Sequence, residues 1–166
     1  MGASAAPSAP VTGLAHVAIK AADLDTTIAF YEQVVGLQLV PRPPFNFVGA
    51  WLGTNGEALI HLYGGERALA SDGTNPHETG SVDHVSLWAR GYAEQRTRFE
   101  EFRLPFREAR PPETTLAQLF VLDPNGVMLE LTYDLRNEPG VEPGKRNDAL
   151  SWTPSLYMQF AGAKPG

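Results

Sequence analysis

Two stretches, Leu14-Ala-His-Val-Ala-Ile-Lys20 and Val82-Asp-His-Val-Ser-Leu-Trp88, decide the fold of this chain. In each stretch aliphatic residues alternate with other side chains, which is the pattern of a β-strand with one buried face. His16 and His84 occupy the middle of their stretches and lie on the face opposite the aliphatic residues. Each strand is therefore predicted to carry one potential metal ligand at its centre.

Two later stretches, Glu57-Ala-Leu-Ile-His-Leu-Tyr63 and Val127-Met-Leu-Glu-Leu-Thr-Tyr133, repeat this pattern. Their central residues on the polar face are His61 and Glu130, each flanked by aliphatic residues that point the other way. The sequence thus predicts four strands with an apolar face, a polar face and one donor atom near the middle of the polar face.

The spacing of these four residues indicates an internal duplication. His16 precedes His84 by 68 residues (84 − 16), and His61 precedes Glu130 by 69 residues (130 − 61). A fixed offset is typical of a repeated unit. An Asn-Gly dipeptide, a strong hairpin signal, stands before the later strand in both halves. Each half is therefore predicted to contain a strand, a helix and three more strands, which is an α+β fold.

Turn and capping residues set the predicted elements within the halves. Asp23 is expected to cap a helix over residues 24–35 that Gly36 ends, and a second helix is expected over residues 92–102. Further strands are expected at residues 37–42, 47–52, 106–110 and 116–123.

Composition divides the chain into five segments. They are a leader (1–11), module one (12–63), a linker (64–80), module two (81–134) and a tail (135–166). The leader has small residues but no basic segment, so we expect it to be disordered and not a signal peptide. The Gly- and Pro-rich linker is long enough to be a mobile lid. The tail turns apolar after residue 152 and is expected to dock on its own subunit or on the second subunit of a homodimer.

The overall composition excludes several function classes. A formal net charge of −6 in 166 residues gives no footprint for nucleic acid. The absence of cysteine excludes disulfides, zinc–thiolate sites and a cysteine nucleophile. No stretch is long and apolar enough to be predicted to span a membrane, so the expected location is the cytoplasm.

The donor chemistry of the four polar strand centres suits a divalent first-row metal. Two histidines and one carboxylate leave coordination positions open for substrate and dioxygen. His16, His84 and Glu130 supply that set, with His61 as a fourth ligand or an acid–base group. The alternative is that these side chains simply face solvent on an open sheet, but their duplicated positions favour a shared site.

Three motifs resemble the vicinal oxygen chelate superfamily, which includes glyoxalases, bleomycin resistance proteins and extradiol dioxygenases. The opening strand around His16 and the helix that contains Phe30-Tyr31 and Val35-Gly36-Leu37 are similar to the opening segment of these proteins. The segment from Phe120 to Leu131 is similar to their closing pair of strands. The resemblance covers roughly residues 12–134. It implies paired βαβββ modules that form a cupped mixed sheet around a metal, with His16, His84, Glu130 and the position of His61 as ligands.

The superfamily hosts several chemistries, in which a small substrate binds the metal through adjacent oxygens. Our leading expectation is an Fe²⁺- or Mn²⁺-dependent extradiol-type dioxygenase that joins O₂ to an aromatic or enolic diol, with His61 as acid–base group. Phe120 departs from the extradiol pattern, which has a tyrosine there. A glyoxalase-like lyase, isomerase or epimerase using Ni²⁺, Co²⁺, Zn²⁺ or Mn²⁺ is the alternative, with Glu130 as displaceable ligand and base. A small-molecule (antibiotic) binding protein with a vestigial metal site is the third.

Four more residues are expected to line the substrate pocket: Tyr63, Trp88, Phe120 and Glu57. The aromatic residues suit a flat substrate. Glu57 shares the strand face of His61 and is either a general base at the mouth or a solvated strand end. Arg42, near a strand end, is either a clamp for a substrate carboxylate or a solvated surface residue.

Overall fold

The computed structural model describes residues 13–77 and 79–162 of the chain, so the predicted leader lies outside the described residues. The described strands form two sheets of four strands each. Module one contributes the sheet with the order β1-β4-β3-β2, in which β1 runs parallel to β4 and the other neighbours are antiparallel. Its strands are β1 (Val17–Lys20), β2 (Gln38–Leu39), β3 (Gly49–Thr54) and β4 (Glu57–Tyr63).

Module two repeats this arrangement. Its sheet has the order β5-β8-β7-β6, again with a parallel pair, β5 and β8, followed by antiparallel neighbours. The strands are β5 (Val85–Trp88), β6 (Phe106–Ala109), β7 (Leu116–Leu122) and β8 (Met128–Asp134). The predicted duplication is therefore confirmed, and the fold is two tandem βαβββ modules whose mixed sheets form one cup.

The helix of module one begins and ends where its capping residues predict. α1 (Leu24–Phe30) starts after Asp23, whose Oδ1 accepts the N–H of Thr26 at 2.8 Å. It continues into a wider π-helical turn, η1 (Tyr31–Val35), which Gly36 ends with a positive φ of 84°. The helix of module two is α2 (Tyr92–Glu101). Both helices occupy the second position of their module, as a βαβββ unit requires.

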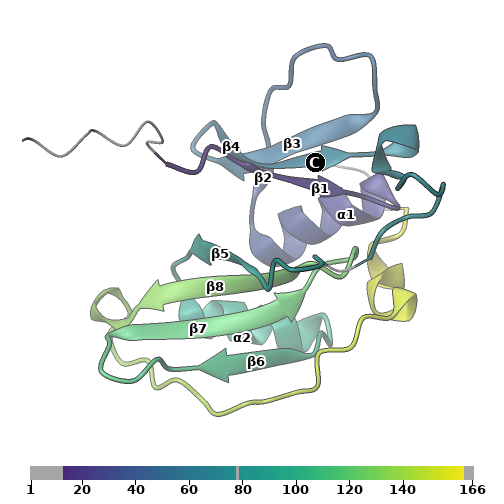
Figure 1. Cartoon of the computed structure of the whole chain (residues 1–166). Coiled ribbons are helices and arrows are strands. Elements are labelled where there is room, and N and C mark those ends of the chain that lie inside the picture. Colours follow the sequence, from purple (N-terminus) through teal and green to yellow (C-terminus); the bar gives the residue numbers. More distant parts are fainter. Residues whose placement is uncertain (1–12, 78, 163–166) are drawn as a thin grey trace, which may run out of the picture.

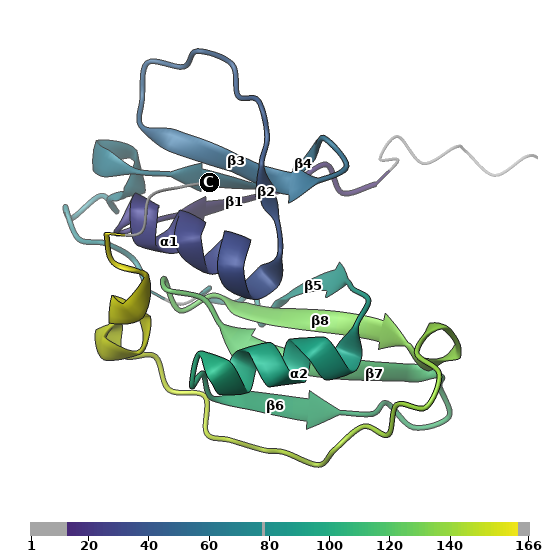
Figure 2. The same cartoon turned by 180° about the vertical axis from the view of Figure 1, so that it is seen from behind.

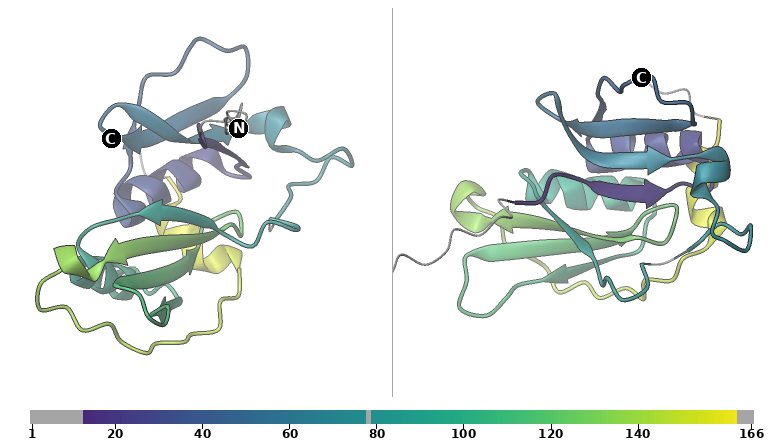
Figure 3. Two further views of the ribbon diagram at one scale, coloured as in Figure 1. Left: turned by 60° about the vertical axis from the view of Figure 1, so that its left-hand side comes forward. Right: turned by 45° about the horizontal axis from the view of Figure 1, so that its top comes forward.

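The two helices lie on the same side of the molecule. Figure 1 shows α2 behind the sheet of module two and α1 below the sheet of module one. Figure 2, seen from behind, shows α2 in front of its sheet, and the right-hand view of Figure 3 shows both helices behind the strands. The edge strands β1 and β5 face each other at the border between the modules, which the right-hand view of Figure 3 shows for β1. The face of both sheets that carries neither helix is called the open face below.

Alternation along the strands sends aliphatic side chains to the helix side. Ile60 and Leu62 of β4, and Leu129 and Leu131 of β8, are all buried in one core that extends through both modules and includes Phe30 of α1. His61 and Glu130 stand between these residues in their strands and therefore point to the open face. The core thus determines the side on which the candidate ligands lie.

A buried polar network joins the two modules. Tyr31 donates its hydroxyl to Asp123 Oδ2 at 3.1 Å, and Asn125 Nδ2 donates to Thr27 Oγ1 at 3.2 Å. Asn125 Oδ1 also accepts the N–H of Ala22 at 3.0 Å. The turn between β7 and β8 is therefore fixed to the helix of module one, and the modules cannot separate without exposing buried polar groups.

Several predicted strand boundaries are wrong in detail. β1 and β5 begin at Val17 and Val85, so His16 and His84 precede their strands and do not lie in the middle of them. The reason is that pairing to β4 and β8 begins only at those residues. The strand predicted at residues 37–42 shrinks to β2, because the prolines that follow cannot donate to a ladder.

The tail docks on its own chain. Tyr157 and Phe160, in the 3₁₀ segment η4 (Pro154–Phe160), are buried and form edge-to-face contacts with Phe30, with ring centres 5.8 Å apart in both cases. Trp152 donates its indole N–H to the carbonyl of Pro124 at 2.8 Å. The apolar tail is therefore part of the core of this subunit. Two further 3₁₀ segments are η2 (Gly65–Ala68) and η3 (Leu135–Asn137).

None of the helices in the described ranges is both long and apolar enough to cross a membrane.

Candidate functional site

The open face of module two holds a close histidine–carboxylate pair. Glu130 is buried in the middle of β8, where β5 and β7 flank it with Ser86 and Phe120 as its cross-strand neighbours. His84 Nε2 lies 3.3 Å from Glu130 Oε2. Two ligands at about 2.1 Å from one first-row metal, at right angles, are separated by about 3 Å, so this spacing fits two donors on one ion.

Two hydroxyl groups hold the other oxygen of Glu130. Ser86 Oγ donates to Oε1 at 2.7 Å, and Thr132 Oγ1 donates to the same atom at 2.6 Å. The two hydroxyl oxygens are themselves 3.0 Å apart. We call Ser86 and Thr132 the hydroxyl clamp. Because the clamp occupies Oε1, the oxygen Oε2 is the one presented to His84.

The imidazole of His84 is oriented in a similar way. Its Nδ1 lies 2.7 Å from Asp83 Oδ1, and the Phe120 ring stands edge-on to it with the ring centres 5.8 Å apart. A carboxylate on one ring nitrogen fixes the tautomer and leaves the other nitrogen free as a ligand. The pair is therefore supported on both sides.

Module one places a stack of rings on the open face. His61 in β4 lies between His16, at 3.7 Å between ring centres, and Trp51 of β3, at 4.1 Å. The interplanar angles are 19° and 7°, so the three rings are nearly parallel. Burial, followed by the positive charges of His16 and Arg42, lowers the pKa of His61. A lowered pKa favours the neutral imidazole, which is the form that binds a metal.

The four predicted ligands thus form two pairs, one in each module. Within residues 13–77 and 79–162, no three His, Cys, Asp or Glu side chains form a group that could hold a metal ion. The donor chemistry of the His84–Glu130 pair fits half of such a site. The other half would have to come from the His16–His61 pair, which stands on the same open face.

The remaining predicted pocket residues differ in their surroundings. Tyr63 is half-buried on the open face against the ring of Phe47, whereas Trp88 at the end of β5 is 76% exposed. Glu57 is exposed at the start of β4 opposite Thr54, in the position of a solvated strand end. Phe120 lies against His84, as described above.

Some residues of the site were missed from sequence although a signal for them existed. Ser86 and Thr132 stand two positions after His84 and Glu130, and a period of two puts them on the same strand face. Trp51 had no such signal: it pairs with His61 across the β3–β4 hairpin only because the register shifts by one residue between Leu52 and Gly53, which the Asn-Gly turn alone does not predict.

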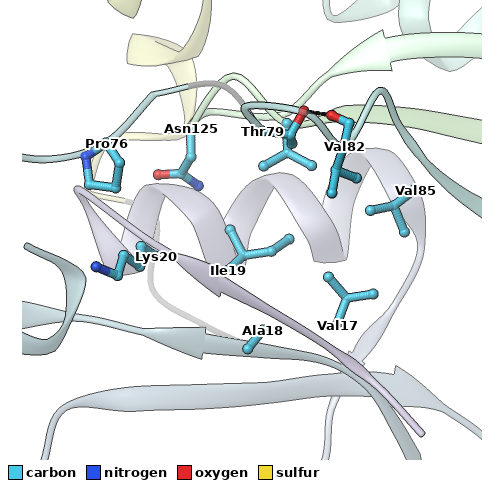
Figure 4. A pocket seen from close by; sticks show the side chains of 10 residues that line it. Val17, Ala18, Ile19, Lys20, Pro76, Thr79, Val82, Val85 and Asn125 are labelled. Carbon is cyan, nitrogen blue, oxygen red and sulfur yellow. Dashed lines mark hydrogen bonds between the residues drawn. The ribbon is translucent and has the colours of Figure 1, made fainter. Parts of the chain in front are cut away.

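A hollow of about 260 Å³ separates the edge strand β1 from the segment that leads into β5. Figure 4 shows Val17, Ala18 and Ile19 of β1 on one side, with Thr79 and Val82 on the other. Aliphatic side chains supply most of its lining, and the predicted ligands are not among them. It lies at the border between the modules and is not the candidate metal site.

A two-module βαβββ fold with histidine–carboxylate and histidine–histidine pairs on its open face defines a class of small-molecule enzymes and binding proteins. The chain belongs to the Glyoxalase/Bleomycin resistance protein/Dioxygenase superfamily, because the family model matches residues 13–131. The resemblance found in the sequence is therefore confirmed.

Individual relatives agree with this family. The protein described as "Glyoxylase I 4" of Arabidopsis thaliana is 30% identical over 127 residues, which are 73% of this chain and 70% of that protein. The lactoylglutathione lyase structure from Agrobacterium tumefaciens has a TM-score of 0.55 and 26% identity, and the match covers 80% of this chain and 100% of that one.

A more distant structure shows the shared fold alone. The genomically encoded fosfomycin resistance protein FosX from Listeria monocytogenes has a TM-score of 0.56 and 15% identity, with 74% of this chain and 93% of that chain covered. The preference for a dioxygenase finds no specific support in these relatives.

Proposed function

We propose that the chain is a divalent-metal-dependent enzyme of the glyoxalase type, a lyase or isomerase that moves a proton between adjacent carbons of a small oxygenated substrate. The observation that carries this proposal is the Glu130 carboxylate, with Oε1 fixed by the hydroxyl clamp and Oε2 turned toward His84 Nε2 on the open face. Support also comes from relatives described as a glyoxalase and as a lactoylglutathione lyase.

We assign the metal ligands to both pairs. His84 Nε2 and Glu130 Oε2 would supply two donors, and His16 and His61 would supply the others from module one. A bound divalent ion would polarise the substrate oxygens and make the neighbouring C–H more acidic. The metal is expected to be Ni²⁺, Co²⁺, Zn²⁺ or Mn²⁺, because imidazole and carboxylate ligands suit these ions.

Glu130 is the proposed base. As a displaceable ligand on the open face, Glu130 would release the ion through Oε2 when the substrate binds, and that oxygen could then take the proton from one carbon and return it to the next. No oxidant or reductant is consumed, since the substrate and product are isomers. The hydroxyl clamp keeps the carboxylate in one rotamer while Oε2 exchanges the proton.

Module one can meet the His84–Glu130 pair in two ways. The cup can close within one chain, or module one of a second copy can supply His16 and His61. We favour a homodimer, because Leu14 and Trp88 are 82% and 76% exposed near the edge strands β1 and β5, and a second subunit would cover them.

Mixing two inactive variants distinguishes these arrangements. If sites are shared between subunits, co-refolded His16→Ala and Glu130→Ala chains regain part of the activity, because one intact site forms in the mixed dimer. If each chain closes its own site, the mixture stays inactive. Light scattering on the same samples gives the number of subunits.

The reaction itself is tested on the metal-loaded protein. We expect formation of lactoylglutathione from its 2-oxoaldehyde and glutathione precursors, or proton exchange on another 2-oxo substrate, without uptake of O₂. Consumption of O₂ with a catechol panel, and no proton transfer, would overturn the lyase proposal in favour of a dioxygenase.

A further inference from the structure

The loop between β2 and β3, together with the strands β3 and β4, forms a row of aromatic side chains beside the candidate metal site. Phe45 and Phe47 stack on each other with ring centres 5.2 Å apart, and Phe45 lies 6.1 Å from Trp51. Phe47 meets the ring of Tyr63 edge-on at 5.5 Å. We call these four residues the aromatic wall. Since Trp51 stacks on His61, the wall leads directly away from the proposed ligands.

Two arginines lie over this wall. The guanidinium carbon of Arg42 is 4.9 Å from the centre of the Phe45 ring and 4.8 Å from that of Phe47. Arg67, from η2 after β4, lies 4.8 Å from the same Phe47 ring and 5.7 Å from Tyr63. Segments far apart in the sequence therefore bring two positive charges to one aromatic ring.

Neither guanidinium has a carboxylate partner among residues 13–77 and 79–162, where the ion pairs involve other side chains. Arg42 uses one N–H to hold the carbonyl of Phe47 at 2.8 Å, and this contact fixes the loop. The rest of its planar donor edge, and that of Arg67, is uncommitted.

Two like charges beside one ring repel each other unless an anion lies between or next to them. An arginine that stacks on an aromatic ring keeps its N–H edge free for a carboxylate or phosphate. A hollow of about 650 Å³ opens between the loop and η2; Phe47, Glu66 and Arg67 line it, whereas Arg42 and the other three residues of the aromatic wall lie beside it. The hollow has room for a small organic anion, and Glu66 limits the negative charge that it would accept.

We propose that Arg42, Arg67 and the aromatic wall form a subsite for a flat organic monocarboxylate, such as an aromatic or conjugated acid. The carboxylate binds the guanidinium edges, and the flat part of the molecule lies along the wall toward His61. As a statement about the substrate class, this rests on the proposed function, since the wall leads to the proposed metal. As a statement about binding, it stands on the geometry of module one alone.

The subsite is tested by calorimetry on the full chain stripped of metal by a chelator. The probes are 2-naphthoate and its neutral analogue 2-naphthamide, so that charge is the only large difference between them. We expect naphthoate to bind and naphthamide to bind at least about tenfold more weakly, because hydrogen bonds to a charged acceptor are the stronger ones. Binding of naphthoate should weaken as salt rises.

The decisive variant is Arg67→Gln, because Arg67 is exposed and its contacts with other described side chains are those with the rings of Phe47 and Tyr63. This substitution should lower the affinity for naphthoate by about tenfold or more and leave the lower affinity for naphthamide unchanged. The matched control is Arg110→Gln, an exposed arginine of module two, which should change neither affinity. Arg42→Gln should act like Arg67→Gln if circular dichroism shows that the loop stays folded.

Equal affinities for the two probes, no binding of naphthoate at millimolar concentration, or an unchanged affinity in Arg67→Gln would each overturn the subsite. These outcomes are separate from a failure of the proposed function. Binding of naphthoate through Arg67, without metal binding or proton transfer, would support the subsite and contradict the proposed function. Metal-dependent activity without naphthoate binding would support the proposed function and contradict the subsite.

Discussion

Glu130 Oε2 lies 3.3 Å from His84 Nε2, while Oε1 of the same carboxylate accepts hydrogen bonds from two hydroxyls on neighbouring strand positions. The two oxygens therefore have different roles, since one fixes the side chain and the other is available to a ligand. Because of this asymmetry, the His84–Glu130 pair has the arrangement of a ligand pair and not that of two polar groups that merely face solvent. Several predictions depend on it.

The hydroxyl clamp should tune metal affinity without holding the fold. Ser86→Ala removes one of the two donors to Oε1, and we expect divalent-metal affinity to fall by about tenfold, the lower end of the range for outer partners of a ligand. Titration calorimetry with Mn²⁺ or Co²⁺ measures this, with Ser81→Ala, at an exposed serine that begins module two, as control. Identical affinities in both variants would show that the clamp has no part in metal binding.

The role of His61 can be separated by measuring binding and turnover together. If His61 is a ligand, His61→Ala lowers the affinity for the metal. If it is an acid–base group, the metal stays and turnover falls by about 10² to 10⁴-fold. The stacking of His61 on His16 leads us to expect the loss of affinity. Unchanged metal binding and unchanged turnover would dismiss both roles.

Asp123 should make stability depend on pH. Burial raises its pKa from the ordinary value of 3.8 to about 6, against the lowering effect of its hydrogen bonds to Val127, Asn125 and Tyr31. A carboxyl whose folded pKa is raised stabilises the fold fully below its unfolded pKa, and this contribution is lost as pH rises through about 6. The free energy of unfolding should therefore fall between pH 4 and pH 6, by an amount on the order of 2–3 kcal/mol.

Denaturant titrations at several pH values check this expectation. Asp123→Asn cannot ionise, so its free energy of unfolding should lose the decline between pH 4 and pH 6. Asp25→Asn, which removes an exposed carboxylate in the first turn of α1, should keep the decline. The expectation fails if the wild type and Asp123→Asn have parallel pH profiles.

The tail should contribute strongly to stability. Phe160 is fully buried against Phe30, so Phe160→Ala is expected to cost about 3–5 kcal/mol, as for other buried aromatic residues. Met158, 71% exposed in the same segment, provides the control, since Met158→Ala should change little. Truncation after Asn147 should lower the melting temperature further. A truncated chain that melts like the full chain would show that the tail is dispensable.

Much of the fold could be predicted because it depends on local signals. The alternation around His61 and Glu130, the duplicated spacing and the Asn-Gly turns determine two modules and the face on which those residues lie. The starts of β1 and β5 could not be predicted, because a strand begins where its partner begins to pair, and the partner is distant in sequence. His16 and His84 therefore precede their strands.

The supporting contacts of the site divide in the same way. Ser86 and Thr132 follow from a period of two along strands that were already identified. The contact of Asp83 with His84 could not be foreseen, because neighbours within a strand point to opposite faces, and the two meet only since both precede β5. The meeting of Arg42 and Arg67 over Phe47 depends on the path of a loop, which no periodic pattern encodes.

The most direct test is metal titration of the wild type beside Glu130→Ala, with Glu101→Ala as a control for an exposed glutamate on α2. We expect the wild type and the control to bind a divalent ion for every chain. Glu130→Ala should bind it more than about 100-fold more weakly, since a ligand matters more than an outer partner, with an unchanged circular dichroism spectrum. Full metal occupancy in folded Glu130→Ala, or no binding by the wild type, would contradict the assignment of Glu130 to a metal centre.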